Sequence, residues 1–237
     1  MLSSFPGSIS VWLLLTRLGE AQILLPLALM TIGSLLWRAK GSSGRALALG
    51  WLALFCVAIS VTTASKIAFM GWGLGWAALD FTGVSGHSMF AAAVYPLLAG
   101  TLAARWSPGK RYAAIGAGFG LALLVGVSRL VIGVHSPSEV VAGLVLGGLA
   151  SALPLAWAGI APASISPLIP ALVAVWLAIM PVTAPASTTH SLVTRMSLML
   201  SGRSEPFTRE DLQRHQQSQH GLPRWRARPA SSLEASL

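Results

Sequence analysis

Charged residues are scarce in this 237-residue chain: they make up 10% of it, whereas hydrophobic residues make up 54%. A soluble globular domain carries about 25% charged residues. The mean hydropathy of +0.70 points the same way. The composition therefore excludes an ordinary soluble domain and predicts an integral membrane protein.

Acidic residues are the rarest charged type. Of seven, only Asp80 and Glu139 lie between Glu20 and Glu205. The net charge of +9 comes largely from arginine and lysine in short loops and in the C-terminal tail, where membrane proteins keep such residues. A basic balance arranged this way argues against a nucleic-acid partner.

The chain also lacks the usual ligands for metals. It has no carboxylate cluster of the kind that binds magnesium, and no Cys/His pattern typical of zinc. Neither a metal nor another cofactor is therefore expected. The single cysteine, Cys56, excludes an internal disulfide and says little about redox compartment. Residues 1–20 lack the basic start and the cleavage site of a secretory signal.

Apolar runs predict an all-α, polytopic transmembrane helical bundle of about six spans. The expected spans are 21–37, 46–65, 88–104, 112–127, 140–158 and 168–182. The organisation that follows is a short interfacial segment (1–20), a transmembrane domain (21–185), and an amphipathic helix with a disordered basic tail (186–237). In that helix Leu192, Val193, Met196, Met199 and Leu200 share a face, with Ser197 off it.

Basic loops at 38–45 and 105–111 alternate with loops that carry histidine, at 67–87 and 128–139. The positive-inside rule places the basic loops in the cytoplasm and both histidine loops on the opposite face. The location predicted is the bacterial inner (plasma) membrane, with the histidines on the extracytoplasmic side. The sequence leaves the oligomeric state open.

The segment 127–139 holds an arginine, a histidine and a glutamate between two apolar runs. Ionisable side chains there are costly to place, so they indicate a functional site. Ser136, Pro137 and Glu139 also form a helix-start pattern, in which Glu139 would be a capping-box carboxylate. Glu139 could therefore cap the helix or bond the imidazole of His135, and the local sequence alone leaves both open.

A second histidine favours the functional interpretation. His87 follows Ser85-Gly86 at the start of the 88–104 span, where free backbone N–H groups and the helix dipole suit an anion. Lys66 and Arg129 can add positive charge on the same membrane face. Two cations, two histidines and one carboxylate suit metal-free phosphoryl transfer, in which the protein supplies positioning and charge stabilisation.

These residues resemble the signatures of the type 2 phosphatidic acid phosphatase family. Ser128-Arg129-x5-His135-x3-Glu139 is similar to its third motif (Ser-Arg-x5-His-x3-Asp), residues 84–87 to its second (Pro-Ser-Gly-His), and Lys66 to the lysine of its first (Lys-x6-Arg-Pro). The resemblance covers about residues 20–155. Four positions depart from it: Gly73 and Leu74 replace Arg-Pro, Val84 replaces proline, and Glu139 replaces aspartate.

The resemblance implies a role for each residue. His135 would be the nucleophile that forms a phosphohistidine, Glu139 would orient it, and His87 would protonate the leaving oxygen. Four residues would hold the phosphoryl oxygens: Lys66, Ser85, Gly86 and Arg129. Asp80 has no counterpart in the motifs. Capping of its own loop, or pairing with Lys66 or Arg129, is expected of it.

The expected function is metal-independent hydrolysis of a lipid phosphate monoester or diphosphate, such as phosphatidic acid, phosphatidylglycerol phosphate or an isoprenyl diphosphate. The partners expected are this substrate and membrane lipids. Two alternatives remain: a phosphotransferase on the same scaffold, and a non-catalytic lipid-phosphate binding or transport protein, which the missing Arg-Pro supports.

Overall fold

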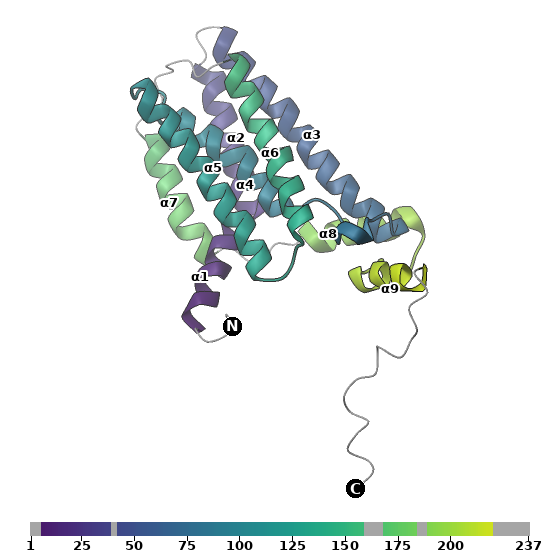
Figure 1. Cartoon of the computed structure of the whole chain (residues 1–237). Coiled ribbons are helices and arrows are strands. Elements are labelled where there is room, and N and C mark those ends of the chain that lie inside the picture. The colour runs from purple at the N-terminus through teal and green to yellow at the C-terminus, as the bar shows by residue number, and fades with distance from the viewer. Residues whose placement is uncertain (1–5, 39–41, 159–167, 184–188, 220–237) are drawn as a thin grey trace.

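The computed structural model describes residues 6–38, 42–158, 168–183 and 189–219 (Figure 1). Over these ranges the chain forms helices and no β-strand, which confirms the all-α prediction. The predicted basic tail at 220–237 lies outside the described residues. The helices are α1 (Pro6–Arg17), α2 (Ala21–Arg38), α3 (Ser42–Trp72), α4 (Gly86–Leu102), α5 (Pro108–Val131), α6 (Pro137–Ala158), α7 (Leu168–Thr183), α8 (Thr189–Ser201) and α9 (Arg209–Gln219), with a single 3-10 turn, η1 (Ala77–Leu79), between α3 and α4.

Three of the described helices, α3, α5 and α6, are long and apolar enough to cross a membrane, and α1 and α2 together form a fourth candidate bent by 43°. The six predicted spans correspond to α2–α7. Helices α4 and α7 have 17 and 16 residues, short of the ~20 that a full span needs. The membrane bundle is confirmed, while six full crossings stay a prediction.

One boundary that differs from the predicted one changes the position of a site residue. The second span does not end at residue 65: α3 continues to Trp72, because residues 67–72 are apolar and helix-compatible up to Gly73, whose φ of +69° ends the helix. Lys66 therefore lies inside a helix. In the N-terminal segment, α1 packs against α5 and α7, and the interfacial position of this segment stays a prediction.

Helix α4 forms the centre of the bundle. It packs chiefly against α5 and α6, and 13 of its 17 residues are buried. Glycines make this approach possible: a Cβ at Gly147 of α6 would lie 2.1 Å from the carbonyl oxygen of Met89, and one at Gly118 of α5 would lie 2.7 Å from that of Tyr95. These glycines thus allow α4, α5 and α6 to pack closely, as small residues do in membrane helix bundles.

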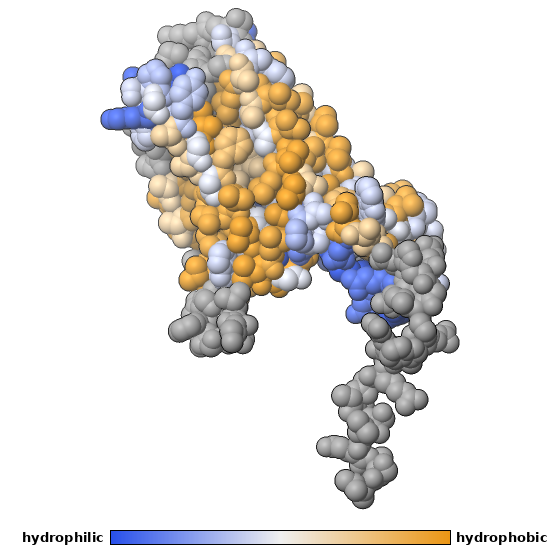
Figure 2. All heavy atoms as spheres, viewed as in Figure 1, coloured by the Kyte–Doolittle hydropathy of each residue, from blue (hydrophilic) through white to orange (hydrophobic). Residues whose placement is uncertain are grey.

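The outer surface of the bundle is apolar. Large exposed hydrophobic side chains lie on α3, α5 and α6, among them Leu49, Val57, Leu123, Val141 and Val145. Figure 2 shows hydrophobic residues over this side, with hydrophilic residues at the end where α5 begins and over α9. The starts of α3 and α5 share one end of the bundle, and the α5–α6 loop lies at the other (Figure 1).

Helix α8 packs against α3 and leaves most of its predicted apolar face exposed. Val193 and Ser197 are buried, whereas Leu192, Met196, Met199 and Leu200 are exposed. Gly71 of α3 leaves room for a close crossing, because a Cβ there would lie 3.2 Å from the Ser197 hydroxyl. That hydroxyl donates to the carbonyl of Ile67 at 3.4 Å. A small polar residue suits such a crossing better than a large apolar one.

Candidate active site

His135 and Glu139 form the centre of the site. Helix α5 ends at Val131, Gly133 turns the chain with a φ of +76°, and α6 begins at Pro137. This short loop brings Nδ1 of His135 to 2.6 Å from Oε2 of Glu139. An ionised carboxylate only accepts hydrogen bonds, so the proton of a neutral His135 lies on Nδ1 and the lone pair on Nε2 is free to react.

Glu139 also caps α6. The backbone N–H of Ser136 donates to Oε2 at 3.1 Å, and the N–H of Glu139 faces the Ser136 hydroxyl at 3.4 Å. Both alternatives that the local sequence leaves open are therefore present at once. The carboxylate completes the capping box and binds His135 through the same oxygen.

The Glu139 side chain is fully buried and has further donors besides these. The Thr82 N–H donates to Oε1 at 2.7 Å, and the Thr82 hydroxyl donates to the same oxygen at 2.5 Å. Arg209 of α9 donates to both oxygens at 2.9 Å. A buried carboxylate keeps its charge only when it is paired and hydrogen-bonded, and this one is.

His87 lies on the first turn of α4, which begins at Gly86 with Ser85 as the N-cap residue. The first N–H groups of a helix have no partner within it, so this end suits an anion. Lys66 reaches the same place from α3: a Cβ on Gly86 would lie 3.8 Å from its Nζ.

Ser85 is the exception among the predicted phosphate-holding residues. Its side chain is fully buried, its hydroxyl lies 3.0 Å from that of Ser88, and its N–H donates to the carbonyl of Glu139 at 3.1 Å. It does not line the cavity described below. In this structure Ser85 joins the start of α4 to α6, and its contact with phosphate stays a prediction.

Arg129 lies on the last turn of α5, and its Nη1 donates to the Thr16 hydroxyl of α1 at 2.6 Å. Its Nε is buried without a hydrogen-bond partner among the described residues, and so is the Thr62 hydroxyl of α3. Both residues line the same cavity. Buried donors without partners are costly, so these two favour a bound polar or anionic group between them.

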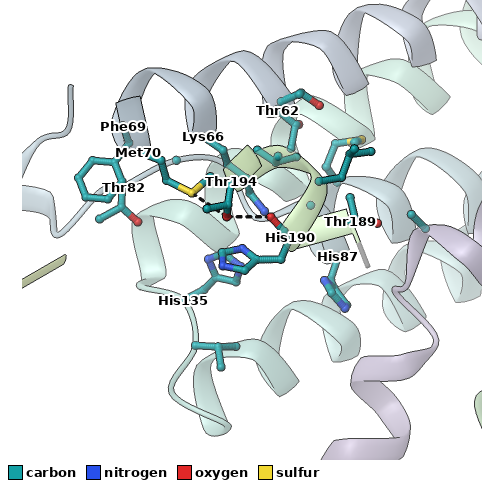
Figure 3. Close-up of a pocket in the computed structure, with 18 of the residues that line it drawn as sticks. Thr62, Lys66, Phe69, Met70, Thr82, His87, His135, Thr189, His190 and Thr194 are labelled. Carbon is teal, nitrogen blue, oxygen red and sulfur yellow. Dashed lines mark hydrogen bonds between the residues drawn. The ribbon is translucent and has the colours of Figure 1, made fainter. Parts of the chain in front are cut away.

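A cavity of about 850 Å³ connects these groups. Its lining combines Lys66, His87, Arg129 and His135 with apolar side chains from α2, α3, α4 and α8, such as Leu25, Ile59, Phe69, Phe90 and Val193. In Figure 3, Lys66, His87, His135 and His190 extend towards this space from different segments. The cavity therefore offers a cationic site beside an apolar wall.

Burial lowers the pKa of His135 from its ordinary value of 6.5, and the nearby charges of Lys66 and Arg129 lower it further. The hydrogen bond and the negative charge of Glu139 act in the opposite direction without cancelling the effect. The imidazole is therefore neutral at neutral pH, which is the form that a nucleophile needs.

Sequence reasoning missed the contribution of residues 189–214, here termed the C-terminal strap. His190 and Arg209 both line the cavity. The expected pairing of Asp80 with Lys66 or Arg129 is wrong: Asp80 forms its ion pair with Arg209. Local patterns carry no sign of this contact between distant segments. The one available signal is the cation absent from the first motif, which could have prompted a search for another.

Comparison with known proteins agrees with this arrangement. The sequence profile described as the PAP2 superfamily matches residues 11–162. A protein described as an uncharacterized 22.5 kDa protein in the cps region of Klebsiella pneumoniae is 39% identical over 215 residues, which cover 85% of this chain and 97% of that protein.

Among solved structures, the transmembrane PAP2-type phosphatidylglycerolphosphate phosphatase of Bacillus subtilis is similar, with a TM-score of 0.51 and 26% identity. The match covers 66% of this chain and 79% of that one. The profile match spans more than half of the chain and includes both histidines, Lys66, Arg129 and Glu139. The chain belongs to the PAP2 superfamily and is a membrane phosphatase.

Proposed function

We propose that this enzyme hydrolyses a lipid phosphate monoester or diphosphate, without a metal, through a phosphohistidine at His135. The observation that carries the proposal is the 2.6 Å contact between Nδ1 of His135 and the buried carboxylate of Glu139. This contact leaves Nε2 unprotonated and oriented by a fixed partner.

In the first step Nε2 of His135 attacks phosphorus, and the bond from phosphorus to the lipid oxygen breaks. His87, protonated at the start, gives its proton to that oxygen, so a lipid alcohol leaves as the neutral alcohol, and from a diphosphate a lipid phosphate leaves with that oxygen protonated. In the second step His87 takes a proton from water, the water oxygen attacks the phosphohistidine, and phosphate is released. His135 and His87 then return to their starting states.

The residues around the phosphoryl group stabilise its charge. Lys66, Arg129 and the N–H groups at Gly86 would hold the phosphoryl oxygens. The unpartnered Nε of Arg129 supports this role. Among the described residues, no group of three or more His, Cys, Asp or Glu side chains is arranged to hold a metal. The oxygens of Glu139 already accept from His135, Thr82, Ser136 and Arg209. This donor set favours electrostatic stabilisation by cations of the protein.

The apolar wall of the cavity favours a lipid as the substrate. The structural relative from Bacillus subtilis is a phosphatidylglycerolphosphate phosphatase, which makes that lipid the first candidate here as well. We place the site on the extracytoplasmic face of the bacterial inner membrane. The basic segments at the start of α3 and α5 support this orientation, because they lie at the end of the bundle opposite the α5–α6 loop.

The experiment is phosphate release by purified protein in detergent from phosphatidylglycerol phosphate, phosphatidic acid and an isoprenyl diphosphate, with EDTA present throughout. Rapid quenching at alkaline pH should trap labelled phosphate on wild-type protein and none on His135→Ala. Activity that EDTA abolishes and magnesium restores would refute the metal-free route. Turnover without any trapped label would count against the covalent intermediate.

A further inference from the structure

Arg209, the first residue of α9, reaches Glu139 across 70 residues of sequence. Its Nη2 lies 2.9 Å from each carboxylate oxygen. The Glu139 side chain is fully buried, and the Arg209 side chain is 32% exposed. The two therefore form a partly buried ion pair, which includes Oε2, the oxygen that Nδ1 of His135 also contacts.

Arg209 is itself held by the loop before α4. Its Nη1 donates to the carbonyl oxygen of Asp80 at 2.9 Å and also pairs with the Asp80 carboxylate. Asp80 has a left-handed backbone, with a φ of 49°, and its N–H donates to the carbonyl of Ala77. The guanidinium is thus fixed between two carboxylates, one in the η1 turn and one on α6.

The strap is fastened to α3 just before Arg209. The N–H of Phe207 donates to the carbonyl of Met70 at 2.9 Å, and its ring covers Gly73, where a Cβ would lie 3.2 Å from the ring. Thr208 then caps α9: its hydroxyl lies 2.7 Å from Oδ2 of Asp211. These contacts leave Arg209 little freedom to lie anywhere but beside Glu139.

We propose that Arg209 is a positioning residue of the active site, which holds the Glu139 carboxylate aimed at Nδ1 of His135 and partly neutralises its charge, while Asp80 holds Arg209. The inference rests on the proposed function, because it assigns a role within the same site. It extends the functional unit from the matched region into the C-terminal strap. Arg209 acts on the carboxylate behind the nucleophile, and Lys66 and Arg129 hold the phosphate.

This division of roles predicts which kinetic constant changes. Without Arg209 the carboxylate loses a charged donor and is held less rigidly beside His135, so the chemical step slows. The phosphate-binding cations stay in place, so KM changes little. Removing an outer partner of a functional histidine costs about 10- to 100-fold in metal sites, and we expect a loss of kcat on this scale for Arg209→Ala.

The experiment compares four variants with wild-type protein: Arg209→Ala, Arg209→Lys, Asp80→Asn and the control Arg214→Ala. The probe is phosphatidylglycerol phosphate in mixed micelles, with phosphatidic acid as a second substrate. Arg214 lies on the same helix and pairs with Glu210 and Asp211 at an exposed surface, so its removal should change kcat by less than about 2-fold. Arg209→Lys keeps the charge but not the fork of donors, and should recover part of the kcat lost in Arg209→Ala.

The pH profile gives a second reading that a merely structural role would not change. His135 faces Glu139 of α6, Lys66 of α3, Arg129 of α5 and His87 of α4, with His190 of α8 and Arg209 of α9 also at the cavity. Loss of the Arg209 cation leaves the Glu139 charge less neutralised. The imidazolium of His135 is then favoured, and the acid limb of kcat/KM should move to higher pH in Arg209→Ala but not in Arg214→Ala.

Three outcomes would overturn the inference. Wild-type kcat and pH profile in Arg209→Ala would make α9 peripheral, and a rise in KM with unchanged kcat would make Arg209 a substrate contact. If Arg209→Ala unfolds, wild-type kcat in both Arg209→Lys and Asp80→Asn would also reject it. Failure of the proposed function differs from all of these, because wild-type protein itself would then release no phosphate.

Discussion

Helices α4 and α6 pack against each other through glycine contacts, whereas the start of α9 in the C-terminal strap is joined to the site by the ion pairs and hydrogen bonds of Arg209. At Gly143 and Gly147 of α6, backbone meets backbone with no space for a methyl group. At Arg209, a flexible side chain spans from α9 to Glu139 and Asp80. The first kind of packing fixes the distance between His87 and His135, and the second adjusts the charge behind His135.

The difference indicates how each region should respond to change. Apolar helix packing in lipid depends on shape, so an added methyl group is a steric error that neighbouring helices must move to accommodate. An ion pair at a partly exposed site depends on charge and geometry, so substitutions there should change rate more than stability. The predictions below test this contrast, from the largest expected effect to the smallest.

The largest effect is expected for His135→Ala, which removes the nucleophile. Phosphate release should fall by at least about 10⁴-fold, because no other group can form the covalent intermediate. The variant should keep the thermal stability of the wild type within a few degrees in detergent. Residual turnover above about a tenth of the wild-type rate would show that another residue attacks phosphorus.

Glu139→Gln should follow, with kcat lower by about 10²–10⁴. Glutamine keeps a capping-box side chain for α6 but loses the negative charge that sets the tautomer of His135. Steady-state kinetics on membrane-inserted protein measure this, with Glu139→Asp as the matched variant that should keep substantial activity. Near-normal turnover in Glu139→Gln would reduce Glu139 to a helix cap.

Gly147→Ala tests the glycine-packed side of the comparison. Its Cβ would lie 2.1 Å from the carbonyl oxygen of Met89, so α4 and α6 must separate. Overpacking of this kind costs about 1–3 kcal/mol or more. The midpoint of thermal unfolding should fall, and activity should fall with it. Gly116→Ala on α5 is the control, because a Cβ there meets nothing within 4 Å.

Phe207→Ala tests the strap and should have a smaller effect on stability than Gly147→Ala. It removes the ring that covers Gly73 and contacts the small cluster of Phe69, Met70 and Val193. Because this loosens the segment that carries Arg209, kcat should fall several-fold while the unfolding midpoint changes little. A large loss of thermal stability with unchanged kcat would contradict the contrast between the two regions.

The smallest effect concerns pH. The pKa of His135 lies below 6.5, chiefly because of burial, so its nucleophilic form is present above that pKa and is lost as the pH falls through it. The acid limb of kcat/KM should therefore have its midpoint below pH 6.5. Measuring this profile with two substrates whose phosphate groups have different pKa values distinguishes ionisation of His135 from ionisation of the substrate. A shared midpoint above 6.5 would contradict the lowered pKa.

Much of the site could be predicted from the sequence because its parts are local. A carboxylate four residues after His135 reaches the imidazole across one helical turn, and Ser136-Pro137 starts that helix regardless of its neighbours. The apolar runs likewise give the bundle. The alternation of basic loops with histidine-bearing loops was enough to predict that Lys66 and Arg129 lie on the same membrane face.

Features that local patterns do not predict depend on contacts between distant segments. The hydrogen bond between Ser85 and Ser88 depends on how α4 meets α6, and the buried side of α8 depends on the space that Gly71 leaves on α3. No local sequence pattern indicates either of these contacts. Helical periodicity shows which side chains share a face of a helix, but not which of these faces a neighbouring helix can approach most closely.

The sequence by itself determined the membrane bundle, the pair of histidines and the carboxylate beside one of them, because hydropathy and helix-start chemistry act over a few residues. Only the tertiary structure decided that Arg209 binds Glu139 and that Asp80 pairs with Arg209 rather than with Lys66 or Arg129. Long polar side chains can pair with any opposite charge within reach. The partner is therefore set by which helices the packing of α3, α8 and η1 brings together.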